Sequence, residues 1–102
     1  MRIYLDDLRS PSREKFTDLA RSAAEFKGIL CSRLKETGFL EYVSFDHDLG
    51  EGLTGYDCAK FLVSLDMERN ILAPNFVYNV HSANPVGRDN IINYLDSYLK
   101  GN

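Results

Sequence analysis

Acidic side chains and histidines gather at three points of this sequence, and each point directly follows a short apolar run. Asp6 and Asp7 follow the first run, the stretch Asp46-His47-Asp48 follows the second, and the stretch His81-Ser82-Ala83-Asn84 follows the third. The chain has 2 histidines, and both belong to these clusters. If the three points meet in space, they bring four carboxylates and both imidazoles into one site.

Carboxylates at such close range repel one another unless a cation or bound protons compensate their charge. A cluster of this kind is typical of a Mg²⁺ site or of general acid–base catalysis. The candidate metal ligands are Asp6, Asp7, Asp46 and Asp48. Histidines suit proton transfer near neutral pH, where one imidazole gives a proton and the other takes it. Taken singly, each of these residues could equally serve a turn or a helix cap.

The segment after His81 supplies an anion-binding element. Asn84-Pro85 has the pattern of a helix N-cap followed by proline in the first turn. The free amides of a helix N-terminus favour an anion. The candidate phosphate contacts are Ser82, Asn84, Arg88 and, after the first acidic pair, Arg9. A site with an acidic side and an anion-binding side suits a phosphate ester.

Helices and strands alternate along most of the chain. Capping boxes at Ser22-Ala23-Ala24-Glu25 and Thr54-Gly55-Tyr56-Asp57 mark two helix starts. The predicted helices run from Ala23 to Thr37, from the Thr54 cap to about Arg69, and from Asn84-Pro85 to the closing Gly101. The predicted strands cover Arg2–Leu5, Thr17–Arg21, Tyr42–Phe45 and Phe76–Val80, and the stretch from Leu8 to Phe16 is mostly loop.

This alternation predicts an α/β fold with right-handed βαβ units and a mostly parallel sheet. Four strands fit the order 2-1-3-4, which is that of a flavodoxin-like sheet without its fifth strand. Ligands of such sheets bind beyond the carboxyl ends of the strands, near the point where the strand order reverses. All three polar clusters are therefore expected on one rim of the sheet.

Length and composition limit the classes of protein to consider. The 102 residues fit one domain, residues 1–102, and 44% hydrophobic with 26% charged residues is ordinary for a soluble globular chain. A net charge of −3 argues against an extended nucleic-acid surface but permits a nucleotide or an RNA end bound at one point. Without a membrane-spanning run or an export signal, we expect no membrane partner and a cytoplasmic location.

The two cysteines, Cys31 and Cys58, lie among apolar neighbours in helical patterns. We expect both to be buried small hydrophobes, and their spacing does not match a zinc site. The oligomeric state stays open.

Four stretches resemble the motifs of the cyclic-phosphate-processing receiver domain, a variant of the receiver domain of two-component signalling. They are Leu5-Asp6-Asp7-Leu8-Arg9, Ser44-Phe45-Asp46-His47-Asp48-Leu49-Gly50, Thr54-Gly55-Tyr56-Asp57 and Val80-His81-Ser82-Ala83-Asn84-Pro85-Val86-Gly87-Arg88. The resemblance runs from residue 2 to about residue 99. It implies a three-layer receiver-like fold and a role in processing cyclic phosphates, such as the 2′,3′-cyclic ends of damaged RNA.

The same resemblance implies roles for single residues. Asp6 and Asp7 match the Mg²⁺-binding acidic pair of ordinary receivers, Asp46 matches their phosphoacceptor, and Ser82 matches their switch hydroxyl. Ordinary receivers also have a lysine after a fifth strand, and this chain has no such strand. This departure argues against phosphorelay signalling, and the added histidines, His47 and His81, point to hydrolytic chemistry instead.

Three functions remain open at this point. The first is a phosphoesterase that opens a cyclic phosphate of a nucleotide or RNA end, with His47 and His81 as acid and base, in either order, and with Asp46 beside them. The second is a module that binds a cyclic nucleotide or a phosphate without cleaving it. The third is a divergent signalling receiver that is phosphorylated on Asp46.

Overall fold

The computed structural model describes residues 1–11, 15–50 and 52–101, without the side chains of residues 34–37. In this part of the chain, a four-stranded parallel sheet with the order β2-β1-β3-β4 packs against three helices. The strands are β1 (Arg2–Leu5), β2 (Asp18–Ala20), β3 (Leu40–Phe45) and β4 (Leu72–Val80). The helices are α1 (Ala23–Thr37), α2 (Gly55–Arg69) and α3 (Pro85–Lys100). The predicted α/β fold and strand order are confirmed.

The helices begin where the sequence satisfies their free backbone amides. Thr54 and Asp57 form a complete capping box at the start of α2. Asn84 caps α3, because its side-chain oxygen accepts a hydrogen bond from the amide of Gly87 at 3.0 Å, and Pro85 occupies the first turn. These bonds pair amides that have no partner within the helix. The structure confirms these helix starts, and α1 has the predicted bounds.

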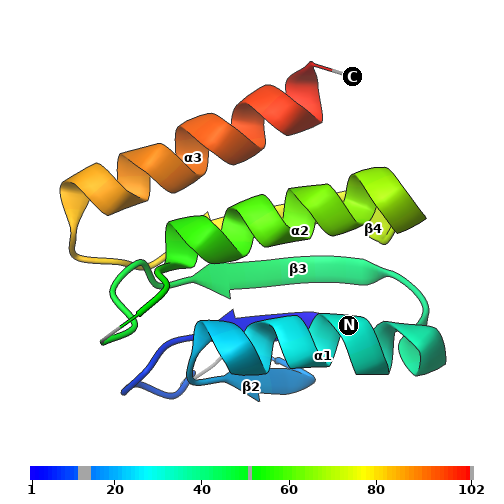
Figure 1. Ribbon diagram of the computed structural model, residues 1–102, viewed down its shortest axis with the longest axis horizontal. Coiled ribbons are helices and arrows are strands. Elements are labelled where there is room, and N and C mark those ends of the chain that lie inside the picture. Colours follow the sequence, from blue (N-terminus) through cyan, green and yellow to red (C-terminus); the bar gives the residue numbers. More distant parts are fainter. Residues whose placement is uncertain (12–14, 51, 102) are drawn as a thin grey trace.

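All three helices pack on one face of the sheet. Phe45 of β3 points to this face and contacts Phe26 of α1, with ring centroids 6.0 Å apart. Tyr78 of β4 points the same way, and its hydroxyl donates to Asp96 of α3 at 2.6 Å. Figure 1 shows α2 between α1 and α3, in front of the strands. The fully buried side chains of the core include Ile3, Leu5, Phe26, Val43, Phe45, Leu62, Ile91 and Leu95.

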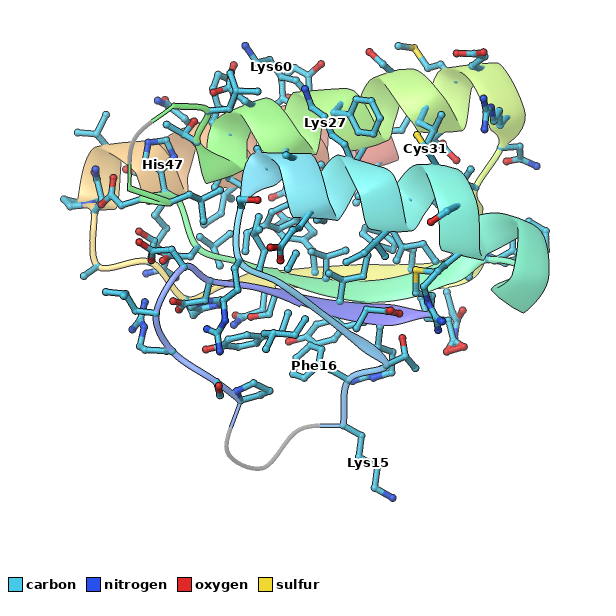
Figure 2. The ribbon with its side chains drawn as sticks, turned by 60° about the horizontal axis from the view of Figure 1, so that its bottom comes forward. Lys15, Phe16, Lys27, Cys31, His47 and Lys60 are labelled. Atoms are coloured by element: carbon cyan, nitrogen blue, oxygen red, sulfur yellow. The ribbon has the colours of Figure 1, made fainter. Side chains whose placement is uncertain are left out.

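The other face of the sheet has no helix among the described residues. Phe16, from the segment between β1 and β2, stacks there on Tyr42 at 5.6 Å and meets Tyr4 edge-on at 5.2 Å. Figure 2 shows Phe16 and Lys15 on the side of the strands away from the helices. The described residues of the β1–β2 crossover form no helix, so the expected third layer contains no helix among the described residues. Residues 12–14 of the predicted loop lie outside the described residues.

Strands β3 and β4 both begin earlier than predicted. β3 starts at Leu40 rather than Tyr42, and β4 starts at Leu72 rather than Phe76. β4 includes Pro74, which cannot donate a backbone hydrogen bond, but β4 is an edge strand whose register with β3 shifts near this point. An edge strand tolerates proline, so the strand includes this residue rather than beginning after it.

The two cysteines differ in exposure. Cys58 is buried in α2 as predicted, and burial raises the pKa of its thiol to about 12. Cys31 is exposed, which corrects the prediction for this residue. It lies on the side of α1 toward α2 and lines a pocket with Leu65 and Arg69 of that helix (Figure 2). None of the described helices is long and apolar enough to cross a membrane.

Candidate functional site

Asp6, Asp46 and His81 come directly after β1, β3 and β4, and their side chains meet at the carboxyl end of the sheet. One potential ligand atom of each residue lies within 4.8 Å of those of the other two. The parallel register brings them together, because the amide of Asp46 donates to the carbonyl of Leu5 and the amide of His81 donates to that of Phe45, both at 2.9 Å. The predicted convergence of the three strand ends is therefore present.

Asp6 is the most enclosed group of the site, with 1% of its surface exposed. Its Oδ1 accepts hydrogen bonds from the amides of Leu8 at 2.9 Å and Arg9 at 2.8 Å. Its Oδ2 accepts from Arg9 Nε at 2.8 Å and from His81 Nε2 at 3.0 Å. Burial raises the pKa of Asp6, but these hydrogen bonds and the charge of Arg9 outweigh burial, so the net pKa lies below its ordinary value. Asp6 is thus an ionised carboxylate whose four lone-pair positions are all in use.

His81 is hydrogen-bonded through both ring nitrogens. Because ionised Asp6 only accepts, His81 Nε2 carries the hydrogen of that bond, and Nδ1 shares a hydrogen bond of 2.7 Å with the hydroxyl of Ser44. Asn79 donates to the Ser44 oxygen at 3.3 Å. The ring also stacks on Tyr4. His81 therefore has a defined orientation.

Asp46 differs from Asp6 in its electrostatic environment. Burial and the negative charge of Asp6 raise the pKa of Asp46, and the nearest cation, Arg9, lies with Nη2 3.7 Å from Asp46 Oδ2. The side chain is buried, yet it forms part of the wall of a pocket at the end of the sheet. The pKa values of the two carboxyl groups are thus shifted in opposite directions, and Asp46 holds a proton more readily than Asp6 does.

This pocket has a volume of about 470 Å³. Gly50, one of its lining residues, has φ near +81° and lies beside the carboxylate of Asp7. Asp48 is exposed at the rim, where it accepts a hydrogen bond from the side-chain amide of Asn84 at 3.4 Å. The pocket is lined by Asp6, Asp7, Leu8, Arg9, Asp46, Asp48, Gly50, Ser82 and Ala83. It therefore contains all four predicted metal ligands and two of the predicted phosphate contacts.

The start of α3 contributes less to this pocket than its sequence suggested. The side-chain oxygen of Asn84 is used on the amide of Gly87, and its nitrogen is used on Asp48. Ser82 lines the pocket, and its hydroxyl oxygen accepts from the amide of Asn84 at 3.1 Å. Arg88 is exposed and does not line the pocket. Among the predicted phosphate contacts, Ser82 and Arg9 are the ones that face this space.

His47 lies apart from His81. Its imidazole packs against Gly87 in the first turn of α3, where a β-carbon would overlap the ring. Its Nδ1 is buried and has no hydrogen-bond partner in the described part of the chain. Figure 2 shows this side chain between the loop that leads to α2 and the start of α3. The structure therefore brings one of the two histidines, and not both, to the buried carboxylates.

Three residues of the network were not singled out from the sequence. Ser44 is hydrogen-bonded to Nδ1 of His81, Asn79 donates to the Ser44 hydroxyl oxygen, and Tyr4 stacks on the imidazole. A signal for Ser44 exists in hindsight, because it is the one polar residue in the apolar run Tyr42–Phe45 and falls on the face opposite to Val43 and Phe45. Tyr4 alternates in the same way with Ile3 and Leu5 of β1.

The donor set of Asp6, Asp46 and His81 has the spacing that a divalent cation needs. The contacts of Asp6, however, leave no lone pair directed at such an ion. The guanidinium of Arg9 already lies against both carboxylates. As arranged here, these residues do not fit Mg²⁺ unless Arg9 moves away, so Mg²⁺ at this site stays a prediction.

Comparison with known families matches residues 1–97 to the model of the cyclic-phosphate processing receiver domain. Neither a curated protein nor a solved structure shows significant similarity to the chain. The matched region covers all four strands, nearly all of α3 and every residue of the pocket. The chain therefore belongs to the family of cyclic-phosphate processing receiver domains.

Proposed function

We propose that this chain hydrolyses a cyclic phosphate of a nucleotide or of an RNA end. The observation that carries the proposal is the hydrogen bond between buried Asp6 and half-buried His81, beside a pocket that Arg9 and Asp46 line. Networks that drive the pKa values of neighbouring carboxylates apart are typical of sites that move protons. The family to which the chain belongs processes cyclic phosphates, which supports this choice of substrate.

Arg9 supplies the anion-binding side of the proposed site. Its Nε is held by Asp6, while the side chain as a whole is 56% exposed at the pocket. A guanidinium has five N–H donors, so Arg9 retains donors for the oxygens of a phosphate while it is bound to Asp6. The hydroxyl of Ser82, which lines the same pocket, provides a second contact. A cyclic phosphate bound by these two residues would lie in the pocket that Asp46 also lines.

Asp46 is the group we assign to proton transfer. Its raised pKa makes it a better base than an ordinary aspartate, and it is the buried carboxylate whose lone pairs are not all occupied by strong donors. A water molecule adds its oxygen to phosphorus and gives its proton to Asp46, while one of the two ring P–O bonds breaks. The proton then returns to the released sugar oxygen, so the product is a phosphate monoester beside a free hydroxyl.

His81 has a supporting role in this scheme. Both of its nitrogens are engaged, so it holds Asp6 ionised and in place rather than exchanging a proton with the substrate. The sequence suggested His47 and His81 as the acid–base pair. In this proposal Asp46 transfers the proton instead, and the charges and hydrogen bonds of Asp6, Arg9 and His81 adjust its pKa.

The proposal is tested by following 2′,3′-cyclic nucleotides in the presence of the purified protein by mass spectrometry. We expect the gain of one water, lost at least about 100-fold in Asp46→Asn because a general base contributes that much. Asp89→Asn is the matched control, since Asp89 is exposed on α3 outside the pocket. Equal turnover by the two variants would remove Asp46 from the mechanism.

One observation favours a second function, the binding of a cyclic nucleotide without cleavage. Asp6 accepts four hydrogen bonds, one of them from His81, so both side chains are held in fixed positions. Fixed side chains serve ligand recognition as well as catalysis. Equilibrium binding by calorimetry, with recovery of the unchanged ligand, distinguishes this function from hydrolysis. Turnover of the ligand in the same experiment would rule it out.

A further inference from the structure

We propose that Arg9 is the resident cation of this site and takes the position between Asp6 and Asp46 that a divalent metal ion would need. The inference goes beyond the proposed function, because it concerns what neutralises the carboxylates whether or not the chain cleaves its ligand. It follows from the contacts of Arg9 with both carboxylates and from the way the backbone of Arg9 is held.

The first step concerns charge. Asp6 and Asp46 are both buried, and the ligand atoms of the cluster lie within 4.8 Å of one another. Two buried carboxylates at this range need a compensating positive charge. Arg9 provides it directly, with Nε 2.8 Å from Asp6 Oδ2 and Nη2 3.7 Å from Asp46 Oδ2. His81 Nε2 donates to the same oxygen of Asp6.

The second step concerns the backbone. Asp6 accepts one hydrogen bond from the backbone amide of Arg9 and another from its guanidinium, so one carboxylate fixes both the backbone and the side chain of Arg9. Arg21, which follows β2, donates from Nη1 to the carbonyl of Arg9 at 2.5 Å and to that of Asp6 at 3.3 Å. Its Nη2 donates to Ser10 at 2.9 Å. The turn that carries Arg9 is therefore held from two sides, and the guanidinium is pre-organised over the carboxylates.

The third step concerns competition. A metal ion bound to Asp6 and Asp46 would have to break the bond of Arg9 with Asp6 and would then lie beside a displaced guanidinium. Both the lost bond and the repulsion between the two cations oppose metal binding. Because a divalent ion and a guanidinium a few ångströms apart repel each other even at the dielectric of a protein surface, removal of Arg9 should raise metal affinity about 10- to 100-fold.

The test is a titration with Mn²⁺, read by the electron paramagnetic resonance signal of the free ion, which requires no knowledge of the substrate. We compare the wild-type chain with Arg9→Gln, Arg9→Lys and Arg69→Gln. Arg69→Gln is the matched control, because Arg69 is exposed in the last turn of α2 and does not line the pocket. We expect weak binding by the wild type, Arg9→Lys and Arg69→Gln, and binding tighter by that factor in Arg9→Gln alone.

Two outcomes would overturn the inference: wild-type binding of Mn²⁺ as tight as that of Arg9→Gln, or an equal gain in Arg69→Gln. If Arg9→Gln does not fold, Arg21→Ala takes its place, because it loosens the turn without stripping Asp6 of its ion pair. Arg21→Ala should then bind Mn²⁺ more tightly than the wild type, and unchanged affinity would count against the inference. None of these readouts uses turnover, so failure of the proposed hydrolysis leaves this test intact.

Discussion

The imidazole of His81 lies flat on the phenol ring of Tyr4, with centroids 4.7 Å apart and an angle of 3° between the ring planes. Tyr4 belongs to β1 and His81 follows β4, so the contact spans the open face of the sheet past β3. The stack and the hydrogen bonds of His81 to Ser44 and Asp6 restrict the ring in different directions. Tyr4 is thereby a positioning residue for the site rather than a group that meets the substrate.

The first prediction concerns this stack. Tyr4→Phe keeps the ring and should retain most of the activity, whereas Tyr4→Leu removes the flat surface and should lower kcat about tenfold, since aromatic pairs contribute about 0.5–1.5 kcal/mol. KM should change little, because Tyr4 does not line the pocket. Steady-state kinetics on both variants check this split. A loss of the same size in Tyr4→Phe would show that the hydroxyl, and not the stack, matters.

The opposite pKa shifts of Asp6 and Asp46 make a prediction about stability and pH. Burial and the charge of Asp6 raise the pKa of Asp46, so ionisation of Asp46 destabilises the folded state as the pH rises through that pKa. Asp46→Asn should therefore be more stable than the wild type at neutral pH. The difference should vanish below the ordinary aspartate pKa of 3.8, where the carboxyl is protonated in both states.

Asp6→Asn should behave in the reverse way. The pKa of Asp6 is lowered, so its charge stabilises the fold above the ordinary value and this contribution is lost as the pH falls through the lowered one. Asp6→Asn should be less stable than the wild type at neutral pH and approach it in acid. Denaturant unfolding of both variants across the acid range measures the two trends. Trends of the same sign would contradict the assignment of charge to these two groups.

Gly87 and Gly28 provide a matched pair of glycine substitutions in helices. A β-carbon at Gly87 would overlap the ring of His47, whereas a β-carbon at Gly28 meets nothing within 4 Å. Gly87→Ala should lower the free energy of unfolding by about 1–3 kcal/mol through overpacking. Gly28→Ala should raise it by about 0.5–1 kcal/mol, because alanine favours the helix. Thermal unfolding checks both signs, and stabilisation by Gly87→Ala would show that His47 moves freely.

The two histidines should differ in their effect on activity. His81→Ala leaves Oδ2 of Asp6 without one of its two donors and should cost about 100-fold or more, as the loss of a supporting group in a proton-transfer site does. His47→Ala should retain most of the activity, because its ring packs on Gly87 outside the pocket. Equal losses in the two variants, measured below their unfolding temperatures, would restore both histidines to the catalytic group.

The residues that could be predicted from sequence are those whose local pattern determines their position. The apolar runs and the caps at Thr54 and Asn84 predict the elements, and parallel topology then brings Asp6, Asp46 and His81 to one rim. The separation of His47 from His81 depends on the close approach of the loop to Gly87, which is a tertiary contact. The full set of hydrogen bonds to Asp6 depends likewise on the contacts that the backbone and side chain of Arg9 make with this carboxylate. No sequence spacing predicts these contacts.

The described residues between β1 and β2 form no helix, and local sequence signals do not decide this feature either. The handedness of βαβ units predicts on which face a crossover lies, but not whether the crossover is a helix. Here Phe16 packs on Tyr4 and Tyr42 where a receiver-like fold would place a helix. Aromatic residues in a loop-like stretch carry no periodic signal, so the sequence left the role of this segment open.

The most direct test of the proposed hydrolysis is to incubate the purified protein with a short RNA that ends in a 2′,3′-cyclic phosphate, with and without a chelator, and to weigh the RNA by mass spectrometry. We predict that the RNA gains the mass of one water at the same rate with and without chelator. We predict that this gain disappears in His81→Ala and Asp46→Asn. An RNA that remains unchanged under every condition would contradict hydrolysis. If it stays bound, the site is a recognition site for cyclic phosphates.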